Sequence, residues 1–235
     1  MDGGYLVTCP VPNAHDKFRE AIYFFHQMHE SYHRPAEFRF NLHAFLNALT
    51  SIDDFIRLDL EKIGLVQEWK AYGATRDRDE LLESLKGGRN RSTHQAQLLC
   101  ESEVSIGIFR NRTIKLAVED NLATDIATAT LLEGAVDHLV GNLIDSEHSA
   151  IGEQIGVKRL YYEKTAIRNS EDLLTSIRRA VTRVSHYLAK GHELANSEFT
   201  PEDEDSLYEP GWSDEVTVLL ETDVNPELVE QWGWN

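Results

Sequence analysis

A long apolar stripe in the first quarter of this 235-residue chain constrains its fold more than any other feature. Between Phe38 and Leu60, apolar side chains recur at steps of three and four residues, which is the period of one buried helix face. Pro35 suits the first turn of such a helix, and Gly64 marks its end. The sequence therefore predicts one helix of nearly thirty residues, expected to be the core of a helical bundle.

Helical periodicity also marks other parts of the chain, so the fold class is expected to be mainly α. Asn13 is a favourable N-cap for the first helix, and Gly87-Gly88 should interrupt or bend the third. Gly191 is expected to end the last one. Besides the long helix, helices are predicted over residues 13–32, 80–99, 124–148 and 169–190.

One segment changes from helical to strand periodicity. Apolar residues alternate with polar or small residues over 104–108 and again over 114–118. Between them, Arg110-Asn111-Arg112 predicts a turn, so these residues should form an inserted β-hairpin with a basic, exposed tip. Residues 149–168 do not favour either type of structure.

The negative charge of the chain is concentrated near its C-terminal end. The net charge is −17, and thirteen acidic residues but no Lys or Arg lie beyond residue 190. The other 27 acidic residues nearly balance all 23 basic ones. Within this near-neutral body, a basic patch that can meet a phosphate backbone falls in one stretch of the chain. Its members are Lys86, Arg89, Arg91, Arg110, Arg112 and Lys115.

The acidic C-terminal segment differs in kind from the body. Residues 202–205 are interpreted as a solvated or disordered linker, and a short strand is predicted at 216–220. Trp212, Trp232 and Trp234 are typical of side chains that dock on a surface. The segment either solubilises the chain, covers the basic patch, or recruits a partner protein. The expected domains are a helical bundle over 1–100, a hairpin with two long helices over 101–191, and this acidic appendage over 192–235.

A candidate site lies in the third helix, where Arg89 and His94 are five residues apart. On an ideal helix this spacing directs the two side chains about 140° apart. One copy therefore does not form a tight pair, but two copies that meet across a symmetry axis can. The alternative is that both residues only cap or brace the helix.

Arg89-Asn90, followed by three residues and His94, resembles the signature of HEPN domains, which are helical domains of many RNA-cleaving toxins and defence nucleases. The run from Phe38 to Leu49 resembles the long second helix of such domains, and the resemblance covers residues 13–100. It implies an up-down helical bundle that acts as a homodimer with a composite active site. The implied activity is that of a metal-independent endoribonuclease in a toxin–antitoxin or antiviral system.

The resemblance also implies a role for each motif residue. His94 would transfer protons, Arg89 would stabilise the charge on the phosphoryl oxygens, and Asn90 would orient the ribose or phosphate. Attack by the RNA 2′-OH would leave a 2′,3′-cyclic phosphate. Asp53 or Asp54 is a candidate to support the catalytic Arg or His, because adjacent carboxylates on a helix point about 100° apart and do not converge on Mg²⁺. The alternative function is a non-catalytic HEPN-like scaffold that binds RNA or a protein.

Neither a metal nor another cofactor is expected. His29 and His33 have a spacing that can bind a metal, but with His26 and Glu30 they are read as a solvated or core-edge helix face. No apolar run approaches the roughly 18 residues that a membrane span needs. With two cysteines and no visible signal peptide, the sequence predicts a cytoplasmic protein without a membrane partner.

Overall fold

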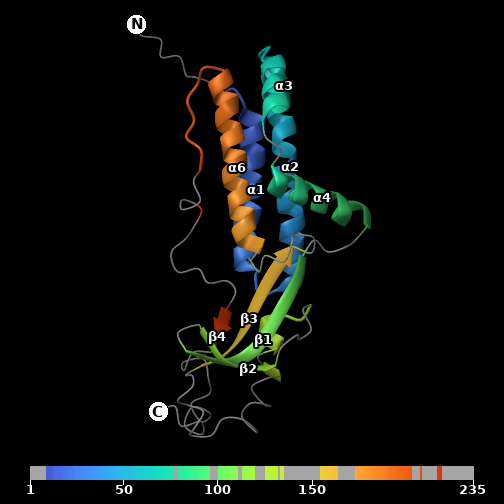
Figure 1. The fold of residues 1–235 in the computed structure, drawn as a ribbon, viewed down its shortest axis with the longest axis vertical. Coiled ribbons are helices and arrows are strands. Elements are labelled where there is room, and N and C mark those ends of the chain that lie inside the picture. Colours follow the sequence, from blue (N-terminus) through green and yellow to red (C-terminus); the bar gives the residue numbers. More distant parts are fainter. Residues whose placement is uncertain are drawn as a thin grey trace. The chain divides into compact units, whose positions relative to one another are not determined.

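The computed structural model describes residues 9–76, 79–95, 100–110, 113–119, 125–131, 133–134, 154–163, 173–202, 207 and 216–218 (Figure 1). The chain forms two compact units, each assembled from three separate segments. The first unit comprises Met1–Gln27, Phe40–Leu99 and Thr165–Pro210. The second comprises Met28–Arg39, Cys100–Lys164 and Gly211–Asn235. The expected domain boundaries at residues 100 and 191 stay predictions.

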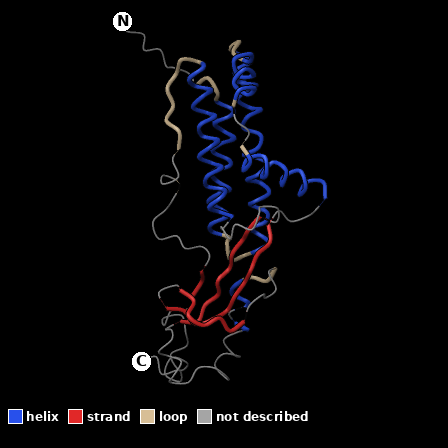
Figure 2. The backbone as a smooth tube through the Cα atoms, in the orientation of Figure 1, coloured by secondary structure: helices blue, strands red, loops and turns tan. Residues whose placement is uncertain are grey.

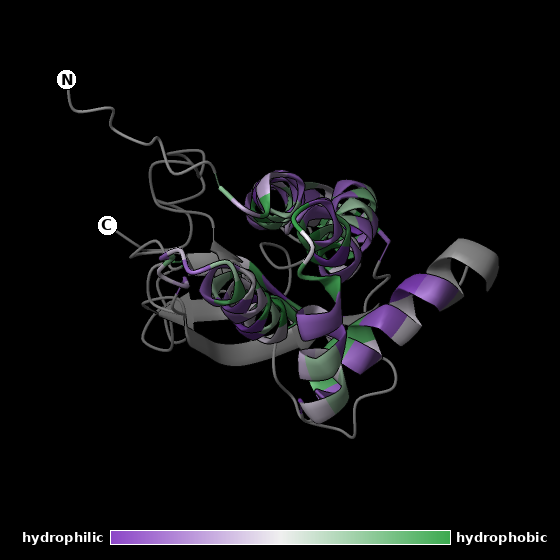
Figure 3. Cartoon of the chain, turned by 90° about the horizontal axis from the view of Figure 1, so that it is seen from above, coloured by the Kyte–Doolittle hydropathy of each residue, from purple (hydrophilic) through white to green (hydrophobic). Residues whose placement is uncertain are grey.

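The structure is mainly helical, as the sequence predicts. The helices are α1 (Pro12–Glu30), α2 (Pro35–Lys62), α3 (Val66–Thr75), α4 (Glu80–Gln95) and α6 (Leu173–Leu194). Helix α2 has 28 residues and carries the apolar stripe that predicted it. Figure 3 shows that the described helices each carry both hydrophobic and hydrophilic residues. Among the described residues, no helix is long and apolar enough to cross a membrane.

The core of the first unit is built from the apolar faces of α1, α2 and α6. Phe18 and Phe25 of α1, Phe45 and Ile56 of α2 and Ile177 of α6 are all at most 5% exposed. Burial of such side chains stabilises a fold by roughly 1.5–3 kcal/mol each. The periodic apolar residues in the sequence are therefore the residues that hold these helices together.

The N-terminus of α1 differs from the prediction. The helix begins at Pro12, so Asn13 lies inside its first turn and is not the N-cap. Proline suits this first position because it has no N–H to satisfy. The backbone carbonyl of Val11 accepts the first hydrogen bond, from the N–H of His15 at 3.1 Å. The sequence predicted Asn13 as the N-cap because it is polar, whereas Pro12 determines where the helix begins.

Two expectations about glycine are also wrong. Helix α4 runs through Gly87-Gly88 without interruption, because glycine lowers helix stability by about 1 kcal/mol without breaking the helix. Gly191 lies buried within α6, which ends three residues later, at Leu194. An ideal Cβ at Gly191 would meet Ile56 Cγ2 and Val11 Cγ1, both at 3.3 Å. Gly191 therefore permits a close approach of helices and does not end one.

Asn196, with φ of 54°, takes the left-handed position that ends α6. The N–H of Ser197 donates to the carbonyl of His192 at 2.9 Å, and that of Asn196 donates to Glu193 at 3.0 Å. These two bonds form a Schellman motif, in which asparagine tolerates the left-handed conformation better than most residues. The motif fixes Ser197 over the last turn of the helix.

A four-stranded antiparallel sheet belongs to the second unit, with strand order β2-β1-β3-β4 (Figure 2). The strands are β1 (Cys100–Arg110), β2 (Thr113–Glu119), β3 (Gln154–Glu163) and β4 (Val216–Val218). The predicted hairpin is confirmed as β1 and β2, and the short strand predicted near 216–220 is confirmed as β4. The undecided segment supplies β3. Of the helix predicted over 124–148, residues 128–131 and 133–134 are helical, residues 125–127 form a turn and bend before it, and the others lie outside the described residues.

The second unit has its own aromatic core. Phe38 and Tyr161 stack with ring centroids 3.9 Å apart, and Tyr32 meets Tyr161 edge-on at 5.0 Å. Beside them lies the fully buried Arg159 of β3, whose Nη2 donates to the carbonyl of Ile126 at 2.5 Å. Aromatic pairs of this kind add about 0.5–1.5 kcal/mol to the effect of burial.

Candidate functional site

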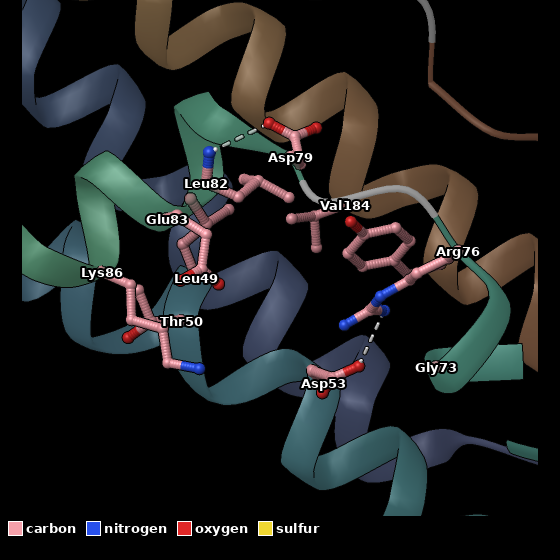
Figure 4. A pocket seen from close by; sticks show the side chains of 11 residues that line it. Leu49, Thr50, Asp53, Gly73, Arg76, Asp79, Leu82, Glu83, Lys86 and Val184 are labelled. Atoms are coloured by element: carbon pink, nitrogen blue, oxygen red, sulfur yellow. Dashed lines mark hydrogen bonds and ion pairs between the residues drawn. The ribbon is translucent and has the colours of Figure 1, made fainter. Parts of the chain in front are cut away.

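A cavity of about 330 Å³ lies within the first unit and is lined from four helical regions (Figure 4). This volume falls at the lower end of the range of about 300–1,000 Å³ that is usual for small-molecule sites. Unlike most such sites, it is lined by several charged side chains. The lining residues are Leu49, Thr50, Asp53, Gly73, Arg76, Asp79, Leu82, Glu83, Lys86, Val184 and Tyr187.

Arg76 crosses one side of the cavity. It follows the last residue of α3, and Figure 4 shows its side chain reaching Asp53 of α2. The distance from Arg76 Nη1 to Asp53 Oδ1 is 3.1 Å, and the guanidinium lies over the ring of Tyr187 at 4.4 Å. Burial raises the pKa of the Tyr187 phenol above its ordinary value. The tyrosine therefore stays neutral and supports the guanidinium as an aromatic face.

Asp79 fixes the start of α4 at the other side. Its Oδ1 accepts a hydrogen bond from the N–H of Leu82 at 3.1 Å, as expected for an N-cap. The same oxygen lies 2.6 Å from Arg183 Nη1 of α6. One carboxylate thus caps α4 and ties it to α6, which determines where the following residues of α4 lie.

Two predicted site residues line this cavity and a third lies close to it in sequence. Lys86 and Asp53 are lining residues, although Asp53 pairs with Arg76 and not with a predicted catalytic residue. Arg89 lies one turn after Lys86 on α4, and its Nε donates to Asn47 Oδ1 of α2 at 2.9 Å. Asn90 is exposed. The structure therefore brings Lys86 and Arg89 to the α2–α4 contact.

The other predicted site residues are not placed in this cavity. Asp54 is exposed on α2 and is not a lining residue. For Arg91 and His94 the structure describes only the helical backbone of α4, so their side chains lie outside the description. The same holds for the side chains of Arg110 and Lys115, while Arg112 lies outside the described residues altogether. Their RNA-binding and catalytic roles stay predictions.

Sequence analysis missed the cavity residues Arg76, Asp79 and Tyr187. Arg76 and Asp79 belong to the charged stretch between α3 and α4, which periodicity marks only as a turn. Tyr187 lies on the predicted last helix, but nothing in its spacing distinguishes it from an ordinary half-buried residue. The available signal was the local excess of alternating charges over 76–79, which often accompanies ion pairs between elements.

A second group of side chains missed by sequence analysis could hold a metal ion. Among the described residues, the set with ligand atoms close enough is Cys9, His15 and His192. This group contains neither His29 nor His33, the pair whose spacing in the sequence is compatible with metal binding. Residues from distant parts of the chain converge here, so local spacing carries no signal.

A family model described as bacteriophage lambda protein ea47 matches residues 7–207. The chain belongs to this family. The matched range contains the residues that line the cavity and the group of Cys9, His15 and His192, and it ends before β4. No curated protein matched the chain, and no solved structure matched it.

Membership of the ea47 family corrects the resemblance to HEPN domains, which is wrong. The resemblance depended on an Arg-Asn-to-His spacing and on a long Phe- and Leu-rich helix. Short polar spacings arise often by chance, and any helical bundle of this size needs a long apolar helix. Neither feature separates one helical family from another.

Proposed function

We propose that this chain binds RNA at the α2–α4 contact and cleaves it without a metal ion. The observation that carries the proposal is the hydrogen bond from Arg89 Nε to Asn47 Oδ1, at 2.9 Å. This bond holds the guanidinium on the side of α4 that also presents Lys86, three residues earlier. Two cations at adjacent turns of one helix face suit two oxygens of a phosphodiester backbone.

The proposed reaction uses general acid–base chemistry. The RNA 2′-oxygen bonds to the neighbouring phosphorus while the bond to the 5′-oxygen breaks. His94 accepts the 2′-OH proton, and the leaving 5′-oxygen gains a proton from a second imidazolium. Arg89 stabilises the negative charge on the phosphoryl oxygens, and Asn90 orients the ribose. The products carry a 2′,3′-cyclic phosphate and a 5′-OH.

The proposed active form is a homodimer with a composite site. Helix α4 is continuous from Glu80 to Gln95. The angle of about 140° between Arg89 and His94 therefore applies, and a single α4 does not direct both side chains at one phosphate. A second copy of α4 can supply the missing histidine. Size measurement of the wild-type chain in solution tests the dimer separately from activity.

An alternative proposal is a non-catalytic scaffold that binds RNA or a protein. The same contact favours it, because a hydrogen bond from Arg89 to Asn47 also braces α4 against α2. In that case Lys86 and Arg89 provide affinity only, and RNA remains intact. The nuclease and an RNA-binding scaffold therefore differ in the fate of RNA and not in whether RNA binds, whereas a protein-binding scaffold leaves RNA unbound.

Incubation of the full chain with mixed RNA in EDTA distinguishes these functions. We expect cleavage in wild type, retained binding with loss of cleavage in His94→Ala, and weakened binding in Arg89→Ala. His186→Ala is the matched control, because His186 is an exposed histidine on α6. Intact RNA that stays bound to the folded wild type would support the scaffold. Equal cleavage by wild type and His94→Ala would reject the assigned chemistry.

We further propose that cleavage serves a toxin–antitoxin or antiviral system, with the acidic, tryptophan-containing segment as the surface for an inhibitor. Expression of the wild-type chain should then arrest growth, and His94→Ala should not. Substitution of both Trp232 and Trp234 by alanine, which leaves β4 in place, should make the arrest more severe if that segment recruits the inhibitor. An unchanged growth rate with the active chain would contradict the toxic role.

A further inference from the structure

Three side chains with metal-binding atoms meet where the lead-in to α1 passes the last turn of α6. The ligand atoms of Cys9, His15 and His192 all lie within 4.8 Å of one another. Cys9 Sγ is 3.7 Å from His192 Nε2, and His15 Nε2 is 2.9 Å from the same nitrogen. Both imidazoles therefore direct their Nε2 atoms to one point, beside a thiol.

The two separations measured from His192 Nε2 are close to those of a tetrahedral zinc site. With Zn–S near 2.3 Å and Zn–N near 2.05 Å, tetrahedral angles place sulfur and nitrogen about 3.6 Å apart and two nitrogens about 3.4 Å apart. The observed sulfur–nitrogen separation of 3.7 Å fits this geometry. The nitrogen–nitrogen separation of 2.9 Å must widen, by about 0.5 Å. A small rotation of the His15 ring supplies that change.

A second layer of contacts orients His192. The Ser197 oxygen lies 2.8 Å from His192 Nδ1 and 3.2 Å from the carbonyl of His192. When the hydroxyl proton is directed at the carbonyl, Nδ1 donates to the Ser197 oxygen, and Nε2 keeps the lone pair that a metal needs. The Schellman motif at Asn196 holds Ser197 in place. This arrangement matches the outer-shell support usual for metal-bound histidines.

The surroundings favour neutral imidazoles. The ring of Phe199 lies 4.8 Å from that of His15 and 5.2 Å from that of His192, so an apolar side chain covers both. Burial, followed by the nearby charge of Arg19, lowers the pKa of His15. Burial, followed by His15, lowers the pKa of His192. Cys9 is exposed, so an ion can reach the group from solvent.

We propose that Cys9, His15 and His192 bind one divalent transition metal ion, and that zinc fits the group best. A thiolate with two imidazoles suits zinc and cobalt and does not suit magnesium or calcium, which prefer oxygen ligands. Binding releases the thiol proton, because the thiolate is the ligand, and it requires the His15 tautomer with its proton on Nδ1, because the Nε2 proton that is shared with His192 must leave. Three protein ligands leave the fourth tetrahedral position for water or another donor. The site shares no residue with the α2–α4 contact and is independent of the proposed RNA cleavage.

Cobalt is the spectroscopic probe for the test. The full chain, stripped of metal by a chelator and kept reduced, is titrated with Co²⁺ and then with Zn²⁺. We expect one Co²⁺ per chain, a thiolate-to-cobalt charge-transfer band and displacement by zinc. Cys9→Ser should remove the band, whereas Cys100→Ser, the matched control, should retain it. Ser197→Ala should weaken cobalt binding by about 10–100-fold without removing the band.

Two further variants test the histidines and guard against misfolding. His192→Gln should weaken cobalt binding more than Ser197→Ala does, and His186→Gln should leave it unchanged. Circular dichroism checks each variant, and His15→Gln replaces His192→Gln if the latter fails to fold. Absence of a thiolate band in wild type would overturn the proposal. A band that survives Cys9→Ser but disappears in Cys100→Ser would also overturn it.

Discussion

The carboxylate of Asp59, on α2, holds the first turn of α1 through Asn13. Its oxygens accept the backbone N–H of Asn13 at 2.8 Å and the side-chain amide of Asn13 at 2.5 Å. The N–H of Ala14 reaches the same carboxylate at 3.2 Å, and Lys62 pairs with it at 2.8 Å. An acidic side chain from one helix thus satisfies the exposed donors at the N-terminus of another, where negative charge is favoured.

Asp59→Asn should therefore destabilise the first unit. An amide cannot accept all these hydrogen bonds, and Asp59 is 2% exposed, so we expect a loss of about 2–3 kcal/mol in the free energy of unfolding. Urea denaturation near neutral pH measures this loss. Asp54→Asn is the control, since Asp54 is exposed on the same helix and should change stability by less than about 0.5 kcal/mol. Equal effects of the two substitutions would contradict the assigned role.

The contribution of Asp59 should also depend on pH. Burial alone would raise the pKa of its carboxyl, but hydrogen bonds from Lys62, Asn13 and Ala14 outweigh burial and hold the pKa below 3.8. The ionised form is thus favoured in the folded chain. Its stabilising effect is complete above pH 3.8 and disappears as pH falls through the folded-state pKa. The stability difference between wild type and Asp59→Asn should accordingly shrink in acid, and a constant difference would argue against this linkage.

The buried Arg159 should be needed for its hydrogen bonds as well as for its bulk. Arg159→Met keeps much of the apolar stem but leaves the carbonyl of Ile126 without this donor, so we expect a loss of about 2 kcal/mol. Arg159→Ala should cost more, because it also leaves a cavity. Thermal unfolding of both variants measures the order. Lys158→Met, on the opposite face of β3, should have a smaller effect, and a reversed order would reject this account.

Substitution of Gly191 should show how close α6 approaches its neighbours. Gly191→Val places a branched side chain where a single Cβ already meets Ile56 and Val11, and should destabilise by about 2 kcal/mol. Gly73→Ala is the matched control in α3, where a Cβ has no neighbour within 4 Å. There we expect a gain approaching about 1 kcal/mol from helix propensity. Similar unfolding free energies for the two variants would contradict the close packing.

Asp79 should control the order of the first turn of α4. Asp79→Ala removes the N-cap hydrogen bond from the N–H of Leu82 and the ion pair with Arg183. It should lower the free energy of unfolding by about 1 kcal/mol. Asp79→Asn retains capping ability and should cost less. Hydrogen exchange of the Leu82 amide provides a local readout, with faster exchange expected in the alanine variant. Unchanged exchange there would mean that Asp79 does not hold the helix start.

The sequence predicted elements that depend on local periodicity, and it failed where distant groups meet. Helix α2 was predictable because one apolar face repeats along nearly its whole length. Strand β3 was not, because its pattern includes Arg159, whose burial depends on Ile126 and Thr128. Asn13 was predicted to be an N-cap from its residue type alone. Its actual role was hidden because Asp59, which accepts its hydrogen bonds, lies 46 positions away.

The candidate sites divide in the same way. Arg89 and Lys86 could be placed on one helix from their spacing, but their contact with α2 could not. Cys9 and His192 are separated by 183 positions, so no local pattern joins them. The HEPN resemblance failed because it relied on local spacing alone. The Arg-Asn-to-His spacing can occur in any helix, whatever residues pack against that helix.

The interleaving of the two units has a consequence for synthesis on the ribosome. Helix α6, from the third segment of the first unit, supplies a large part of that unit's core, and β4 joins the sheet only from residue 216 onward. The apolar faces of the early helices therefore stay partly uncovered until the residues of α6 have been synthesised. During that interval α2 presents the longest uncovered apolar stripe, which makes the nascent chain a natural client of chaperones.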